Sequence, residues 1–121
     1  MKLKKAVEIL ENQSNSLITL KKGDEISIKS INEVVMVRVE DNQVIVYDKN
    51  ENYISNKRLY ELEKILGKDF FRISKSTIIN IKEVDCVIPL FKGIMNVKME
   101  NGLETTISRK YLQDFKKNLG L

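Results

Sequence analysis

Three short polar runs carry the side chains of this 121-residue chain that could do chemistry. Arg109 follows Ser108 at the expected start of a helix, Lys75 stands between two serines, and Asn42 lies in an expected turn. A guanidinium on a fixed backbone can donate two parallel hydrogen bonds to planar acceptors such as guanine O6 and N7. Lysine suits a phosphate or a guanine acceptor better than a two-bond contact with adenine. These residue types favour recognition by hydrogen bonding over catalysis.

Each of these residues also has an ordinary structural interpretation. Arg109 could be a solvated residue, although cations are disfavoured at helix N-termini, which favours a functional role. Lys75 could belong to a polar turn between strands. Asp41-Asn42 is a common turn pair, and Asp41 or Gln43 could take the place of Asn42 at the same loop.

A second group of side chains could hold phosphate. Its members are polar or cationic and lie in or beside the same runs: Ser74, Ser76, Arg72, Lys110 and Lys57. Arg72 alternates with Phe71 and Ile73 and should point away from them, so a phosphate contact and a salt bridge are equally consistent with its position. Asn80 is expected to be a structural turn residue.

The charge is mildly basic and unevenly distributed. Twenty-one Lys and Arg against seventeen Asp and Glu leave a net charge of +4. Residues 57–75 hold six cations and three anions, and residues 109–117 hold four cations and one anion, so each segment carries a net +3. The surplus therefore lies beside the polar runs, where it would support binding to a polyanion, although a solvated surface has the same appearance.

Several classes of function are disfavoured by what the chain lacks. It has no histidine, which removes histidine-dependent triads and histidine metal sites. No paired carboxylates lie in an apolar motif and no glycine-rich loop could cradle phosphate, so we expect no enzyme and no cofactor. The single cysteine, Cys86, allows no internal disulfide, and no apolar run would span a membrane. A cytoplasmic protein is expected.

Alternating apolar residues and turn signals predict a mainly antiparallel β fold with two or three short peripheral helices. The expected strands cover residues 17–21, 25–29, 34–40, 43–48, 53–55, 70–73, 78–81, 84–90, 94–99 and 103–107. The expected helices cover residues 2–11, 57–66, capped by Asn56 and ended by Gly67, and 109–118, capped by Ser108. Asn101-Gly102 predicts a hairpin, because both residues tolerate positive φ. Residues 1–16 form an expected helix and connector, and residues 17–121 one domain.

Residues 31–119 closely resemble the LytTR family, the DNA-binding domains of many bacterial transcription regulators. The resemblance rests on one apolar–polar–apolar motif, a hairpin signal and a polar helix start: Phe70 to Asn80, Asn101-Gly102, and Ile107-Ser108-Arg109-Lys110-Tyr111. It implies that Arg109 reads a base, that Lys75 occupies a DNA-contacting position where asparagine or arginine is common, and that Asn42 lies in a base-contacting loop.

The resemblance also implies how the molecule would act. Loops of the β fold, rather than a recognition helix, would enter successive major grooves of bent double-stranded DNA. Copies would bind direct repeats, one per half-site, as a dimer on DNA. The receiver domain of two-component response regulators, which many members carry, would lie outside this chain.

Two alternatives stay open at this point. A β-rich protein-interaction module could recruit a partner through exposed strand edges, without DNA specificity. Single-stranded nucleic-acid binding would need aromatic side chains on an open sheet face, for which Tyr47 and Tyr53 are the candidates.

Overall fold

The structure, a computed structural model, describes residues 17–121, and the expected helix over residues 2–11 lies outside this range. The described part is mainly antiparallel β, as the sequence predicts, with two α-helices and three short 3₁₀ helices at its periphery. Its elements are β1 (Leu17–Lys22), β2 (Glu25–Ser30), η1 (Ile31–Glu33), β3 (Met36–Glu40), β4 (Gln43–Tyr47), β5 (Asn52–Ser55), α2 (Leu59–Leu66), β6 (Phe70–Ser74), β7 (Thr77–Asn80), η2 (Ile81–Glu83), β8 (Val84–Pro89), η3 (Phe91–Gly93), β9 (Met95–Met99), β10 (Glu104–Thr106) and α3 (Arg109–Leu119).

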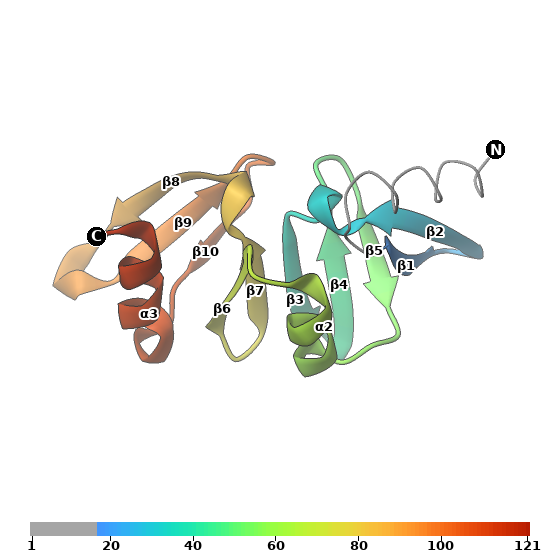
Figure 1. The fold of residues 1–121 in the computed structure, drawn as a ribbon, viewed down its shortest axis with the longest axis horizontal. Coiled ribbons are helices and arrows are strands. Elements are labelled where there is room, and N and C mark those ends of the chain that lie inside the picture. Colours follow the sequence, from blue (N-terminus) through green and yellow to red (C-terminus); the bar gives the residue numbers. More distant parts are fainter. Residues whose placement is uncertain (1–16) are drawn as a thin grey trace.

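The strands form two sheets. The larger has seven strands in the order β2-β1-β5-β4-β3-β7-β6, and the smaller has three in the order β10-β9-β8. Every strand pair is antiparallel. Figure 1 shows α2 packed against the larger sheet and α3 beside the smaller one.

The core has two parts, one on each face of the β3 region. Val37 packs with Val46, Leu62 and other side chains beneath α2, whereas Met36 packs with Phe115 of α3 and residues of the smaller sheet. The apolar run at residues 34–37 is buried throughout, so this segment is covered on both faces. The alternation of a strand thus distributes one short segment between two cores.

Two hairpin turns behave differently from each other. Asp41 and Asn42 both have positive φ, at 50° and 64°, and join the directly paired residues Glu40 and Gln43. This is the two-residue turn whose twist suits a hairpin. At the second turn the expected hairpin is confirmed, since β9 and β10 pair across Asn101-Gly102, but only Gly102 has positive φ. The side-chain oxygen of Asn101 accepts a hydrogen bond from Leu103 N, 3.1 Å away, within this turn.

The start of α2 also corrects the sequence analysis. The helix begins at Leu59, and its N-cap residue is Arg58 rather than Asn56. Glu61 Oε1 accepts a hydrogen bond of 2.8 Å from the Arg58 backbone N–H. A side chain of the first helical turn thus supplies the acceptor for the backbone N–H of the residue before the helix. Gly67, at φ 90°, ends the helix as expected. Ser108 is the N-cap residue of α3, but its side chain makes no capping hydrogen bond.

Candidate nucleic-acid interface

The three polar runs lie at one end of the molecule. Val39 N donates to Ser76 O at 2.9 Å, which joins the end of β3 to the β6–β7 turn. Ser108 N donates to Ile73 O at 2.8 Å, which joins the start of α3 to the end of β6. The β6–β7 turn and the start of α3 are both at the lower end of Figure 1. The two backbone hydrogen bonds fix the spacing of the runs. We call this end, comprising residues 41–42, 74–76 and 108–110, the loop end.

Arg72 holds the backbone of the β6–β7 turn through its side chain. Its Nε donates to Ser74 O at 2.8 Å and its Nη2 donates to Lys75 O at 2.6 Å. Its Nη1 forms an ion pair with Glu63 Oε1 of α2, also at 2.8 Å. The Arg72 side chain is only 19% exposed. Of the two roles that the sequence left open, the salt bridge is formed, and all three guanidinium nitrogens are engaged.

The serines of this turn differ in their surroundings from the lysine between them. Ser74 Oγ accepts from Ser76 N at 3.1 Å and lies 3.4 Å from Ser76 Oγ, so both half-buried hydroxyl groups take part in the turn. Lys75 is exposed at the apex, and within residues 17–121 its ammonium group has no ion-pair partner. The turn therefore presents one free cation on a fixed backbone.

Arg109 is the first residue of α3 and is exposed. The backbone before it is anchored, since Ile107 is buried and donates its N–H to Met95 O at 2.9 Å. No acidic side chain of the described chain pairs with Arg109. Its neighbour Lys110 places Nζ 5.6 Å from the centre of the Tyr111 ring. The Arg109 guanidinium therefore extends from an anchored backbone and is available to an external acceptor.

Asn42 is exposed at the tip of the β3–β4 hairpin. It lines a hollow of about 470 Å³ together with Lys57 and Arg58, the residues just before α2. Glu40 beside the hairpin is bound by the Tyr47 hydroxyl group. Burial, and then the hydrogen bond to Glu40, raise the pKa of Tyr47, which keeps the phenol protonated as a donor. One of the two carboxylates near the hairpin is therefore held within the protein.

Arg58 is a residue of this end that the sequence analysis did not select. The expected helix start placed it inside a helix, whereas it lies in the loop before α2 and is exposed toward the hollow beside Asn42. Residue 58 has no acceptor side chain of the kind that usually caps a helix, so the sequence did not indicate it as the N-cap.

Asn80 is the structural residue that the sequence predicts. It is buried, donates to Val34 O at 2.8 Å and accepts from Lys82 N at 3.0 Å.

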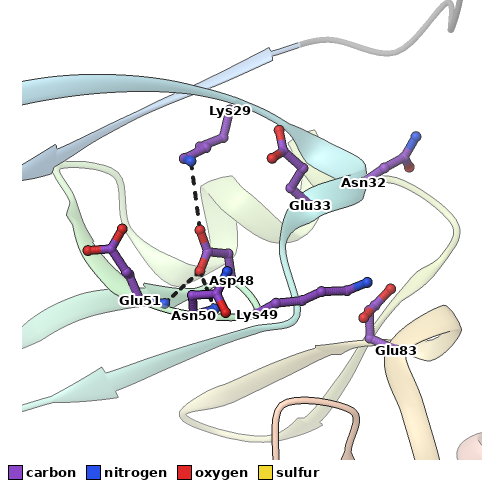
Figure 2. A pocket seen from close by; sticks show the side chains of 8 residues that line it. All are labelled: Lys29, Asn32, Glu33, Asp48, Lys49, Asn50, Glu51 and Glu83. Carbon is purple, nitrogen blue, oxygen red and sulfur yellow. Dashed lines mark hydrogen bonds and ion pairs between the residues drawn. The ribbon is translucent and has the colours of Figure 1, made fainter.

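The opposite end of the larger sheet has a different electrostatic character. Figure 2 shows a hollow there that is lined by four carboxylates, two lysines and two asparagines: Glu33, Asp48, Glu51, Glu83, Lys29, Lys49, Asn32 and Asn50. Burial alone would raise the pKa of Asp48, but hydrogen bonds from the backbone N–H groups of Glu51 and Asn50, with help from Tyr53 and Lys29, lower it. The carboxylates make this end unsuited to a polyanion.

Residues 17–121 lack two further kinds of feature. No helix in this range is long and apolar enough to cross a membrane. No group of three or more His, Cys, Asp or Glu side chains in it could hold a metal ion.

The chain is similar in sequence and in fold to known DNA-binding domains. The LytTr DNA-binding domain family matches residues 24–120 of the chain. A solved LytTr DNA-binding domain of a methyl-accepting/DNA response regulator from Bacillus cereus superposes with a TM-score of 0.83 at 27% identity. The superposition covers 88% of this chain and 99% of that one.

Curated relatives come from Staphylococcus aureus. An uncharacterized HTH-type transcriptional regulator of strain NCTC 8325 / PS 47 is 32% identical over 97 residues, and its counterpart in the bovine strain RF122 is 33% identical. The match covers 80% of this chain and 66% of each relative, so the chain corresponds to just under two thirds of their length. In residues 17–121, five strands separate α2 from α3, so these helices do not form a helix-turn-helix.

Proposed function

The chain belongs to the LytTR family of DNA-binding domains, and from that premise we propose that it reads specific double-stranded DNA as part of a bacterial transcription regulator. The observation that carries the proposal is the meeting of three polar runs at the loop end, each on an anchored backbone. This arrangement fixes the backbone that carries the donors, which reduces the conformational entropy lost on binding.

The proposed roles follow from exposure and partners. Arg109, Asn42 and Lys75 are exposed and are assigned to base contacts, and the two cations lack ion-pair partners among residues 17–121. Lys110, Ser74 and Ser76 are assigned to phosphates, with Lys57 and Arg58 as further cations beside Asn42. Arg72 is assigned to positioning the turn rather than to phosphate, because its nitrogens already have partners.

The proposed mode of reading uses loops. The β3–β4 hairpin and the start of α3 would enter successive major grooves, while the β6–β7 turn between them would cross the intervening minor groove. A duplex that serves both contacts would bend, and its deformability would add to specificity. Copies would occupy direct repeats as a dimer on DNA.

The regulatory context is inferred from the relatives. Those of S. aureus carry the name transcriptional regulator and extend beyond the matched region, and the B. cereus domain comes from a response regulator. A receiver domain or another signal-sensing part would therefore act on this domain from outside residues 1–121. Because bacterial DNA lies in the cytoplasm, we infer that the protein acts there.

The first test is selection of bound duplexes from a random double-stranded pool by the 121-residue chain, followed by affinity measurements over a range of salt. Recovery of a repeated short motif, with log affinity falling linearly with log salt, is the expected result. The alternative, a protein-interaction module using strand edges, would give no enrichment and little dependence on salt. That result would overturn the proposed function.

A further inference from the structure

We propose that β2 is a pairing edge for a second copy of this chain, which joins two seven-stranded sheets across a two-fold axis at Ser27. β2 is the outermost strand of the larger sheet, and within residues 17–121 it pairs with β1 alone. Figure 1 shows it at the side of the molecule farthest from α3. The pairing stands on the geometry of β2, and only its consequence for DNA rests on the proposed function.

The other strand edges of the described chain are protected, and β2 is not. At β6 the carbonyl group of Ile73 is taken by Ser108 N. β8 ends in Pro89 and has an irregular register, and β10 is only three residues long. These are the usual means by which proteins prevent pairing at sheet edges. β2 has six residues, no proline and an unbroken register with β1.

The hairpin decides which backbone groups of β2 face outward. Lys22 and Glu25 are directly paired across the two-residue turn at Gly23, so they form a hydrogen-bonded pair. The alternation of an antiparallel ladder then directs the N–H and C=O groups of Ile26 and Ile28 away from β1. In an antiparallel pairing with Ser27 opposite Ser27, Ile26 lies opposite Ile28 of the second copy. That pair is hydrogen-bonded on both sides of the axis.

The same register matches the side chains on both faces of the joined sheet. Ile26 is 65% exposed and Ile28 is 44% exposed, and each would be covered by the other copy. On the opposite face, Glu25 would lie against Lys29 of the second copy. The Lys29 side chain is 27% exposed and its Nζ is 3.8 Å from Asp48, which leaves room for a second carboxylate. The two-fold axis repeats every contact, so each favourable pair counts twice.

The orientation of the two copies in this dimer differs from that of two copies bound to adjacent direct repeats. A two-fold axis perpendicular to the sheet reverses the strand direction, so the Asn42 hairpins of the two copies lie toward opposite ends of the combined sheet. Direct repeats on one duplex require copies in the same orientation. The β2-linked dimer therefore presents two loop ends to two separate DNA segments.

A disulfide tests the register directly. In a Cys86→Ser background, which removes the exposed native thiol, Ser27→Cys places two cysteines opposite each other. Directly opposed residues of a non-hydrogen-bonded pair have Cα atoms about 4.5 Å apart, within disulfide range. Glu25→Cys is the matched control, because its two copies would be about 14 Å apart in this register. With oxidised glutathione, Ser27→Cys is expected to form covalent dimers and Glu25→Cys to stay monomeric.

Sedimentation equilibrium of the 121-residue chain tests the surface without a crosslink. Ile26→Lys is expected to raise the dissociation constant of the dimer about tenfold, because the change acts on both sides of the axis. Phe91→Lys, which removes the most exposed large apolar side chain of the described chain, is expected to leave it unchanged. A chain that stays monomeric up to about 1 mM would overturn the proposal. So would equal crosslinking by the two cysteine variants, or loss of the dimer in Phe91→Lys alone.

Discussion

Arg72 donates a hydrogen bond from Nη2 to the carbonyl oxygen of Lys75, 2.6 Å away. The largely buried guanidinium of Arg72 thus fixes the backbone of Lys75, whose own ammonium group is exposed. The same guanidinium holds Ser74 O and Glu63. Its planar fork satisfies three acceptors in directions that a lysine ammonium group could not reproduce.

Replacing Arg72 with lysine therefore distinguishes a positioning role from a phosphate contact. Arg72→Lys keeps the charge and loses the fork, so we expect a loss of about 1–3 kcal/mol in the free energy of unfolding in urea. Specific DNA affinity should fall while the dependence of log affinity on log salt is preserved. If the lysine variant binds DNA as the wild type does, the positioning role is wrong.

Arg109→Ala should remove one base reader without disturbing the fold, since the backbone before it is held by Ile107 and Ser108. We expect a loss of about 1–3 kcal/mol on the selected site and little change on non-specific duplex. Competition binding with both duplexes measures the difference. Equal losses on the two would remove Arg109 from base reading.

Asn42→Gly separates the side chain of Asn42 from its turn. Glycine adopts the observed φ of 64° without strain, so the free energy of unfolding should change by less than about 1 kcal/mol. Specific DNA affinity should fall nonetheless, because the amide group that would contact a base is gone. Asn42→Ala serves as the strained comparison, with a lower melting temperature expected. Full specificity in the glycine variant would contradict a reading role.

Lys75→Ala should blur one position of the selected DNA motif. The exposed lysine at the apex of the β6–β7 turn is assigned to a base contact in the intervening minor groove. Adenine N3 and thymine O2 accept hydrogen bonds there, whereas G·C pairs add a donor amino group, so affinity should fall chiefly for duplexes with an A·T pair at that position. Lys68→Ala is the matched control, because Lys68 is also exposed but precedes β6 at its far end. Uniform weakening on all sequences, with a salt slope smaller by about 1, would assign Lys75 to phosphate instead.

Asp48 should contribute stability that is lost in acid. Its pKa is below the ordinary value of 3.8 in the folded protein, so the unfolded chain binds more protons at low pH and stability rises with pH in that range. The contribution is complete above about pH 4 and disappears as pH falls through the folded pKa. Asp48→Asn should lower stability at pH 7 and flatten the acid limb of a pH–stability curve. An unchanged limb would show that the folded pKa is not lowered.

The sequence alone was sufficient for features governed by neighbouring residues. The mainly antiparallel β fold, the helix end at Gly67 and the Asp41-Asn42 hairpin follow from alternation, periodicity and the dihedral preferences of single residues. The motif from Phe70 to Asn80, with Asn101-Gly102 and residues 107–111, is also enough to indicate the family. The division into residues 1–16 and 17–121 stays a prediction.

The tertiary structure decided how those elements meet and which side chains stay free. Ser76 lies beside Val39, and Ser108 beside Ile73, through backbone hydrogen bonds between residues more than thirty positions apart. Arg72 could have faced phosphate or a carboxylate until α2 brought Glu63 within 2.8 Å of it. Local propensities determine the dihedral angles of a segment, but the partner of a charged side chain depends on which distant segment packing brings within reach. The loop end is therefore a product of the packing.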